Sequence, residues 1–140
     1  MLIHTEAQLN TEAQLRITHE DVLRVMIEVV EEYGRDYVYQ RQPGPGGPND
    51  KCVYIKDGQP SCLIGHVLVR LGVDVSFLTD RNSALIASHL FDSPEANRPW
   101  TPMAGAVMEA AQLAQDVGDT WGKALDDARR KAEQFAWASA

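Results

Sequence analysis

The sequence predicts an α+β domain, mostly helical, in which a two-stranded antiparallel hairpin covers a central buried helix and an αα-hairpin forms the C-terminal part. Three observations support this prediction. An apolar helical segment with its own start and stop signals lies near the middle of the chain. Two short runs typical of β-strands precede it, and two alanine-rich helical patterns follow it. With 140 residues, the chain is long enough to bury one hydrophobic core.

The central helical segment spans residues 61–72. Ser61 follows a proline and is a good N-cap, and Gly72 is the residue type expected just past a helix end. Apolar side chains occupy most positions between them, so we expect neighbouring elements to bury this helix on most sides. Gly65 would let another backbone segment approach the helix closely. The one polar stripe, with residues spaced four apart, consists of Cys62, His66 and Arg70.

The chain begins with a tandem duplication of the sequence TEAQL. Two copies of five residues are too short for a repeat architecture, so we divide the chain into an N-terminal arm, residues 1–17, and one globular domain, residues 18–140. Thr18, followed three positions later by an acidic residue, is typical of a helix start. Apolar residues then recur at helical spacing as far as Gly34, which predicts a helix over residues 19–33.

Two short β patterns precede the central helix, one over residues 35–41 and one over residues 52–56, the second ending at the turn pair Asp57-Gly58. The proline- and glycine-rich stretch between them, residues 42–50, should not form regular structure. In an antiparallel pair, aromatic and aliphatic side chains would lie on opposite faces, and the aliphatic face is the natural candidate to cover the helix. The aromatic face would contain Tyr37, Tyr39, Cys52 and Tyr54, and the aliphatic face Val38, Val53 and Ile55.

The sequence pattern of the C-terminal region predicts two helices that pack against each other. Thr101-Pro102 combines an N-cap with a proline at the first helical position, and the helix that follows should end at Gly118. Asp119-Thr120 starts the last helix, whose apolar stripe is rich in alanine. Small residues on both helices favour close antiparallel packing. A further short helix is predicted over residues 84–91.

The charge balance argues against nucleic acid as a direct partner. Twenty acidic and 13 basic side chains give a formal net charge of −7, which repels phosphate backbones. The basic run at residues 129–131 is flanked by carboxylates and is typical of a solvated helix face. No apolar run reaches the roughly eighteen residues that span a bilayer, and no secretory signal pattern opens the chain. We therefore expect a cytoplasmic protein with reduced cysteines and no membrane contact.

Cys62 and His66 allow three chemical hypotheses. With Cys52 they could supply three zinc ligands, but a structural zinc site needs a fourth, which His89 or an aspartate would have to provide. Cys62 could instead be a nucleophile with His66 as its base, although no oxyanion donor or third orienting residue can be named. A disulfide between Cys52 and Cys62 is disfavoured in a reducing compartment.

The simplest hypothesis is that Cys62 and His66 are structural and that the protein holds no cofactor. Cys62 would be a small buried residue, and a carbonyl, a tyrosine or a carboxylate would hold the imidazole of His66 by a hydrogen bond. Candidate binding residues are then the aromatic side chains that a partner could contact, because aromatic residues are enriched at protein interfaces. They are Tyr37, Tyr39, Tyr54 and Trp137.

Residues 52–73 (CVYIKDGQPSCLIGHVLVRLGV) and residues 119–128 (DTWGKALDDA) resemble small uncharacterised proteins encoded by actinobacterial phages and sometimes by their hosts. The resemblance spans residues 18–130. It centres on a Gly-x-Pro-x-Cys-x-x-Gly-His pattern formed by Gly58, Pro60, Cys62, Gly65 and His66. It implies a phage or prophage accessory protein in an actinobacterial cytoplasm, and it brings no activity, cofactor or catalytic residue.

The function that the sequence favours is therefore a non-enzymatic accessory protein that binds a host or phage protein, with homo-oligomers also compatible with the sequence. The acidic composition and the lack of a cofactor fingerprint or a complete catalytic set support it. One alternative is a small Cys/His-dependent enzyme or zinc-binding module centred on Cys62 and His66. A second alternative is an acidic decoy that occupies a nucleic-acid-binding protein.

Overall fold

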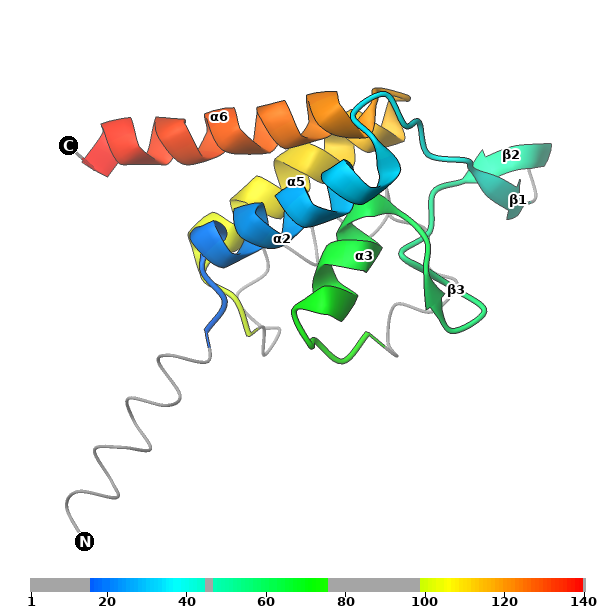
Figure 1. The fold of residues 1–140 in the computed structure, drawn as a ribbon, viewed down its shortest axis with the longest axis horizontal. Coiled ribbons are helices and arrows are strands. Elements are labelled where there is room, and N and C mark those ends of the chain that lie inside the picture. Colours follow the sequence, from blue (N-terminus) through cyan, green and yellow to red (C-terminus); the bar gives the residue numbers. More distant parts are fainter. Residues whose placement is uncertain (1–15, 45–46, 76–98, 140) are drawn as a thin grey trace, which may run out of the picture.

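The computed structural model describes residues 16–44, 47–75 and 99–139, and it confirms a mostly helical α+β fold. The two C-terminal helices pack as an antiparallel pair, as predicted, and the first helix lies against both of them (Figure 1). The central helix packs beneath the first one and also contacts the penultimate helix. These helices are α2 (His19–Tyr33), α3 (Leu63–Arg70), α5 (Pro102–Asp116) and α6 (Trp121–Ser139).

Helix α2 begins and ends where the sequence predicts. Thr18 and Asp21 form a capping box: the Asp21 N–H donates to the Thr18 hydroxyl at 3.2 Å, and the Thr18 N–H donates to the Asp21 carboxylate at 3.0 Å. Gly34 ends the helix with a φ of 98°, a conformation that other L-residues rarely adopt. One face of the helix is buried, and it carries Val22, Val25, Met26, Val29 and Val30.

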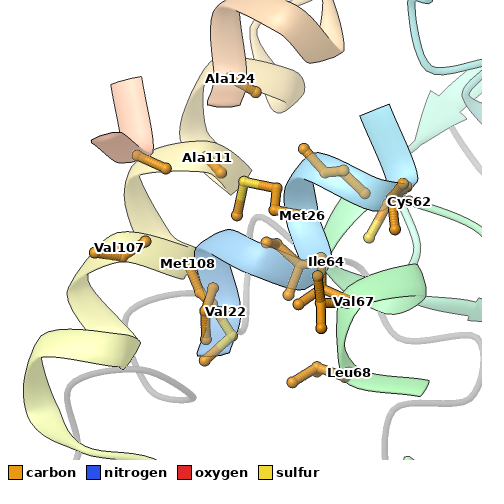
Figure 2. Packing of buried hydrophobic residues seen from close by; sticks show 14 of the residues in the cluster. Val22, Met26, Cys62, Ile64, Val67, Leu68, Val107, Met108, Ala111 and Ala124 are labelled. Atoms are coloured by element: carbon orange, nitrogen blue, oxygen red, sulfur yellow. The ribbon is translucent and has the colours of Figure 1, made fainter. Parts of the chain in front are cut away.

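The hydrophobic core lies where α2, α3, α5 and α6 meet. Figure 2 shows Met26 of α2 between Ala111 of α5 and Ile64 of α3. Ala111 and Ala124 are both fully buried between α5 and α6, where their small side chains allow the two helices to approach closely. The Thr101 hydroxyl caps α5 by accepting the Ala104 N–H at 3.1 Å, which confirms the predicted start of this helix.

The strands form antiparallel hairpins: β3 (Ile55–Lys56) falls within the predicted strand at residues 52–56, but the pairing partners and the other strands differ from the prediction. Gln42 pairs with Lys51 in the first hairpin, and Ile55 pairs with Pro60 in the second, which leads directly into α3. The strands are β1 (Gln42–Gly44), β2 (Gly47–Lys51), β3 (Ile55–Lys56) and β4 (Gln59–Pro60).

The β1–β2 hairpin corrects the prediction that residues 42–50 form no regular structure. Proline cannot donate a ladder hydrogen bond, but both strands of a two-stranded ribbon are edge strands, where one side needs no partner. Pro43 and Pro48 are therefore compatible with pairing. The turn between β3 and β4 is found as predicted, and the φ angles of Asp57 and Gly58, 52° and 77°, are those of a type I′ hairpin turn.

Residues 35–41 do not form the predicted strand, and the tyrosines rather than the aliphatic side chains of this segment face the core. Tyr39 is buried, whereas Val38 is 40% exposed. The hydrogen bonds explain the difference, because the Trp121 N–H at the start of α6 donates to the Tyr37 carbonyl at 2.8 Å. The segment is therefore held against α6, and Val38 bridges to Thr120.

Most of the predicted arm, residues 1–15, lies outside the described residues. The predicted short helix at residues 84–91 lies wholly outside them. Ile17, the last residue of the arm, is described: it is buried, its N–H donates to Pro99, and its carbonyl accepts from Thr101 at 2.9 Å. None of the helices in the described ranges has both the length and the apolar character that crossing a membrane requires.

The backbone of Tyr54 comes very close to α3 at Gly65, in keeping with the prediction that this glycine lets another backbone segment approach. A Cβ at this position would overlap the carbonyl oxygen of Tyr54 and would lie 2.9 Å from the carbonyl carbon. Because both atoms belong to the backbone, they cannot swing aside as a flexible side chain could.

We predict that Gly65→Ala lowers the free energy of unfolding by about 3 kcal/mol, at the upper end of overpacking effects. Val69→Ala, at an exposed position on the same helix, should change it by less than about 1 kcal/mol. Urea unfolding followed by circular dichroism measures both values. Similar losses in the two variants would contradict the close approach at Gly65.

Candidate functional site

Cys62 caps the N-terminus of α3. Its backbone is extended, and its sulfur accepts the Gly65 N–H at 3.4 Å. The prediction of Ser61 as the N-cap is wrong, because the Ser61 hydroxyl hydrogen-bonds the Tyr39 hydroxyl at 2.7 Å instead. Cys62 is fully buried, within the cluster of core side chains that Figure 2 shows.

Two buried glutamines of α5, which the sequence analysis missed, complete this cap. Gln115 Oε1 accepts the Leu63 N–H at 2.8 Å, and Gln112 Oε1 lies 3.5 Å from the Cys62 sulfur as a thiol acceptor. Both side-chain amides donate to the Asp116 carboxylate, at 2.8 and 3.2 Å, which turns their oxygens toward α3. Helical periodicity could have identified these glutamines, because they share the buried face of α5 with Met108 and Ala111.

The surroundings of Cys62 keep its thiol protonated. Burial is the main cause that raises the pKa of the Cys62 thiol far above its ordinary value, and the nearby Asp116 carboxylate raises it further. The Gly65 N–H lowers this pKa, but its effect is smaller than that of burial. Because the thiolate is the reactive form of cysteine, a fully buried thiol of this kind is a poor nucleophile.

His66 has different neighbours from Cys62. Its ring centroid lies 5.0 Å from that of Tyr33 in α2 and 5.8 Å from that of Trp121 in α6. Among the described residues, the imidazole makes these ring contacts and no side-chain hydrogen bond. The expected hydrogen bond with a carbonyl, a tyrosine or a carboxylate is therefore not found among the described residues, where the rings of Tyr33 and Trp121 pack on the imidazole instead.

The imidazole of His66 is half-buried, and this burial is the first cause that lowers its pKa. The nearby guanidinium of Arg70 lowers the pKa further, while the carboxylate of Glu32 raises it. Arg70 and Glu32 also form an ion pair that joins α3 to α2. His66 is therefore neutral at pH 7, next to a charged pair at the surface.

The residues proposed as zinc ligands do not come together. Cys52 and Cys62 are separate buried thiols, and the Cys62 sulfur is engaged by Gly65 and Gln112, whereas His66 packs on aromatic rings. The described parts of the chain contain no group of three or more His, Cys, Asp or Glu side chains that could hold a metal ion. The fourth ligand considered from sequence, His89, lies outside the described residues.

Four rings gather where the C-terminus of α2, the N-terminus of α6 and helix α3 meet. The centroid of Trp121 lies 4.5 Å from that of Tyr37, in an edge-on arrangement, and 5.1 Å from that of Tyr33. Trp121 is fully buried, and within the described residues its indole N–H has no hydrogen-bond partner. Tyr33 is 40% exposed, so the cluster of Tyr33, Tyr37, His66 and Trp121 reaches the surface.

Of the four predicted binding residues, the structure places Tyr37 in this cluster. Tyr39 and Tyr54 belong to the buried hydrophobic core, so their rings are not exposed to a partner in this structure. Trp137 lies in α6, and its side chain is outside the described part of the structure. Tyr33 was missed, although it continues the apolar stripe of α2 one turn beyond Val29.

Three exposed carboxylates lie on the last two turns of α2, and that of Glu32 is close enough to His66 to affect its pKa. Glu28, Glu31 and Glu32 are all exposed, and among the described residues Glu32 alone of the three has an ion-pair partner. The C-terminal end of a helix carries partial negative charge, and the last turn of α2 has no basic residue to offset it. We give the name aromatic–acidic surface to the accessible rings of the cluster together with the exposed residues on the last two turns of α2 and on α3 beside His66: Glu28, Glu31, Glu32, Tyr33, Tyr37, His66 and the 39% exposed Val69.

Comparison of the chain with protein-family models, with curated proteins and with solved structures finds no match. The resemblance to phage proteins is therefore still an expectation. Only the geometry of the described residues bears on function.

We predict that Gln115→Met lowers the free energy of unfolding by about 1–3 kcal/mol, because the buried Leu63 N–H loses its acceptor while the side-chain volume is kept. Gln59→Met, the same substitution at an exposed position, should change it by less than about 0.5 kcal/mol. Urea unfolding measures both variants. An equal loss of unfolding free energy in the two variants would mean that the side-chain amide of Gln115 does not cap α3.

We predict that part of the stability lost on acidification comes from His66. Its folded pKa lies below its unfolded value, so the unfolded chain binds the proton first and stability falls as the pH drops through about 6.5. His66→Phe keeps a ring at this position and removes the titration. Urea midpoints between about pH 8 and pH 5 should therefore fall less in His66→Phe than in the wild type. Parallel curves would contradict the lowered pKa.

Proposed function

We propose that this chain is a non-enzymatic binding protein whose partner is another protein, and that the partner presents lysine or arginine side chains to the aromatic–acidic surface. The observation that carries the proposal is the position of Tyr33. Its ring is 40% exposed and lies next to the ring of His66, at the end of a helix whose last two turns carry three exposed carboxylates. Exposed aromatic rings framed by polar groups are typical of protein contact sites.

The chemistry of this surface suits a basic partner. A cation over the face of an aromatic ring is attracted by the ring's electron distribution, and nearby carboxylates strengthen the attraction. The carboxylates of Glu28 and Glu31, which no described residue pairs, add a negative potential that would attract a positively charged partner to the C-terminal end of α2. The net charge of the whole chain, −7, acts in the same direction.

The same charge complementarity supports a more specific version of this function, in which the protein occupies the basic surface of a nucleic-acid-binding protein as an acidic decoy. Such proteins collect lysine and arginine side chains on one face. If the resemblance to phage proteins holds, the partner is a host or phage protein in an actinobacterial cytoplasm. The enzyme alternative has less support, because the Cys62 thiol is fully buried and protonated.

The test uses the full chain as bait in an actinobacterial lysate, with quantitative mass spectrometry of the proteins it captures. We predict that a captured partner is retained by the wild type and lost with Tyr33→Ala, whose affinity should fall by about tenfold or more, as at an interface hot spot. Glu28→Gln combined with Glu31→Gln should also weaken capture. Glu133→Gln, the same chemical change on α6, should leave it unchanged.

A titration with an arginine-rich peptide and with a glutamate-rich peptide tests the chemistry of the partner directly. The arginine-rich peptide should shift the NMR signals of Tyr33 and Tyr37 and of the Trp121 indole N–H, and the glutamate-rich peptide should not. Equal responses to both peptides, or a partner that Tyr33→Ala still captures, would refute the proposed surface.

A further inference from the structure

A second surface, which shares no residue with the aromatic–acidic surface, lies along the C-terminal helix pair. Helices α5 and α6 border a groove of about 620 Å³ that opens to solvent, which we call the α5–α6 groove. Leu113 and Val117 line it and are 52% and 77% exposed, the largest fractions among the exposed large hydrophobic side chains of the described residues. Side chains of this kind at a groove are typical of a contact surface.

Four charged residues at the start of α6 and along this side of it alternate in sign at a spacing of four. Asp119 and Asp127 alternate with Lys123 and Lys131, and three of the four line the groove. Arg130 also lines the groove, outside this row, and forms an ion pair with Asp127 of its own chain. The Lys123 ammonium lies 2.9 Å from the Asp127 carboxylate and 4.0 Å from that of Asp119, which precedes the helix. Residues four apart form one ridge on a helix surface, and two such ridges interdigitate when like helices pack together.

This charge row is complementary to a reversed copy of itself. In an antiparallel arrangement centred on residue 125, Asp119 would face Lys131 of the partner subunit, and Lys123 would face Asp127 of the partner subunit. Every position in the row then meets the opposite charge, and the same contacts occur twice because a two-fold axis relates the copies.

The apolar side of the groove has the same symmetry. Leu113 lies near the middle of the exposed row on α5, with the small Ala110 on one side and the larger Val117 on the other. A two-fold axis at Leu113 would place Val117 over Ala110 of the partner subunit. Because α5 and α6 run antiparallel from a short turn, the centres of the two rows lie within about 2 Å of each other along the hairpin.

We propose that the α5–α6 groove is the contact surface for a second copy of this chain, in a two-fold dimer with antiparallel α6 helices. The aliphatic side chains of Leu113 and Val117 supply the apolar centre. The charge row sets the orientation and the register of the two copies. The dimer would present two aromatic–acidic surfaces, but its formation does not depend on their function.

Sedimentation velocity of the full chain, from low to high micromolar concentration, tests this dimer, with circular dichroism to confirm folding of each variant. Leu113→Asp should abolish the dimer, because it places two carboxylates at the axis. Lys131→Asp should weaken it by about tenfold or more, since the reversal acts twice. Arg129→Asp makes the same charge change at an exposed position outside the row and should leave the dimer intact.

The decisive variant carries both Asp119→Lys and Lys131→Asp. It restores opposite charges across the axis, so its dimer should return to within about threefold of the wild-type affinity. A wild type that stays monomeric throughout the range would overturn the proposal and leave the groove to a different protein. A dimer that survives Leu113→Asp, or a double variant that fails to recover, would overturn the proposed contact or its register.

Discussion

The buried N-terminus of α3 is the constraint on which the rest of the structure depends. The first N–H groups of a helix have no partner within the helix, and inside a core they cannot be satisfied by water. Here the Cys62 sulfur and the Gln115 side chain accept two of them, and Asp116 holds Gln115 in the orientation that this requires. The cap therefore fixes α3 against α5. The absence of a Cβ at Gly65 lets the Tyr54 backbone lie directly against α3 as well.

The N-terminus of α6 is satisfied in a related way, and the candidate site is a consequence. The N–H groups of Trp121 and Gly122 donate to the carbonyls of Tyr37 and Arg35, at 2.8 and 2.9 Å. A Cβ at Gly122 would lie 2.8 Å from the Arg35 carbonyl oxygen, so a glycine is needed for this contact. Because the segment after α2 is held here, the rings of Tyr33 and Tyr37 are placed against Trp121.

The sequence predicted the helices well, because helix caps and the spacing of apolar residues depend on residues that are close together in the chain. Thr18, Gly34 and Thr101 mark helix ends in the structure as they do in the sequence. The strands and the site could not be predicted in the same way, because distant partners decide them. If Cys62 lay inside the helix, it would share one face with His66. In the structure Cys62 is the N-cap instead, and its sulfur accepts the Gly65 N–H. The two side chains therefore have different neighbours, and their i,i+4 spacing wrongly predicted that they share one face of the helix.

The Gly-x-Pro-x-Cys-x-x-Gly-His pattern, which carries the resemblance to phage proteins, has a structural explanation at most of its positions. Gly58 has a positive φ in the β3–β4 turn, Pro60 ends β4, Cys62 caps α3, and Gly65 allows the Tyr54 backbone to approach. Substitutions at these four positions would act by changing the fold, whatever the protein binds. His66 is half-buried and belongs to the ring cluster, where it contacts Tyr33. The pattern therefore specifies how the chain folds around α3, and the partner contact that we propose rests mainly on exposed residues that the pattern does not include.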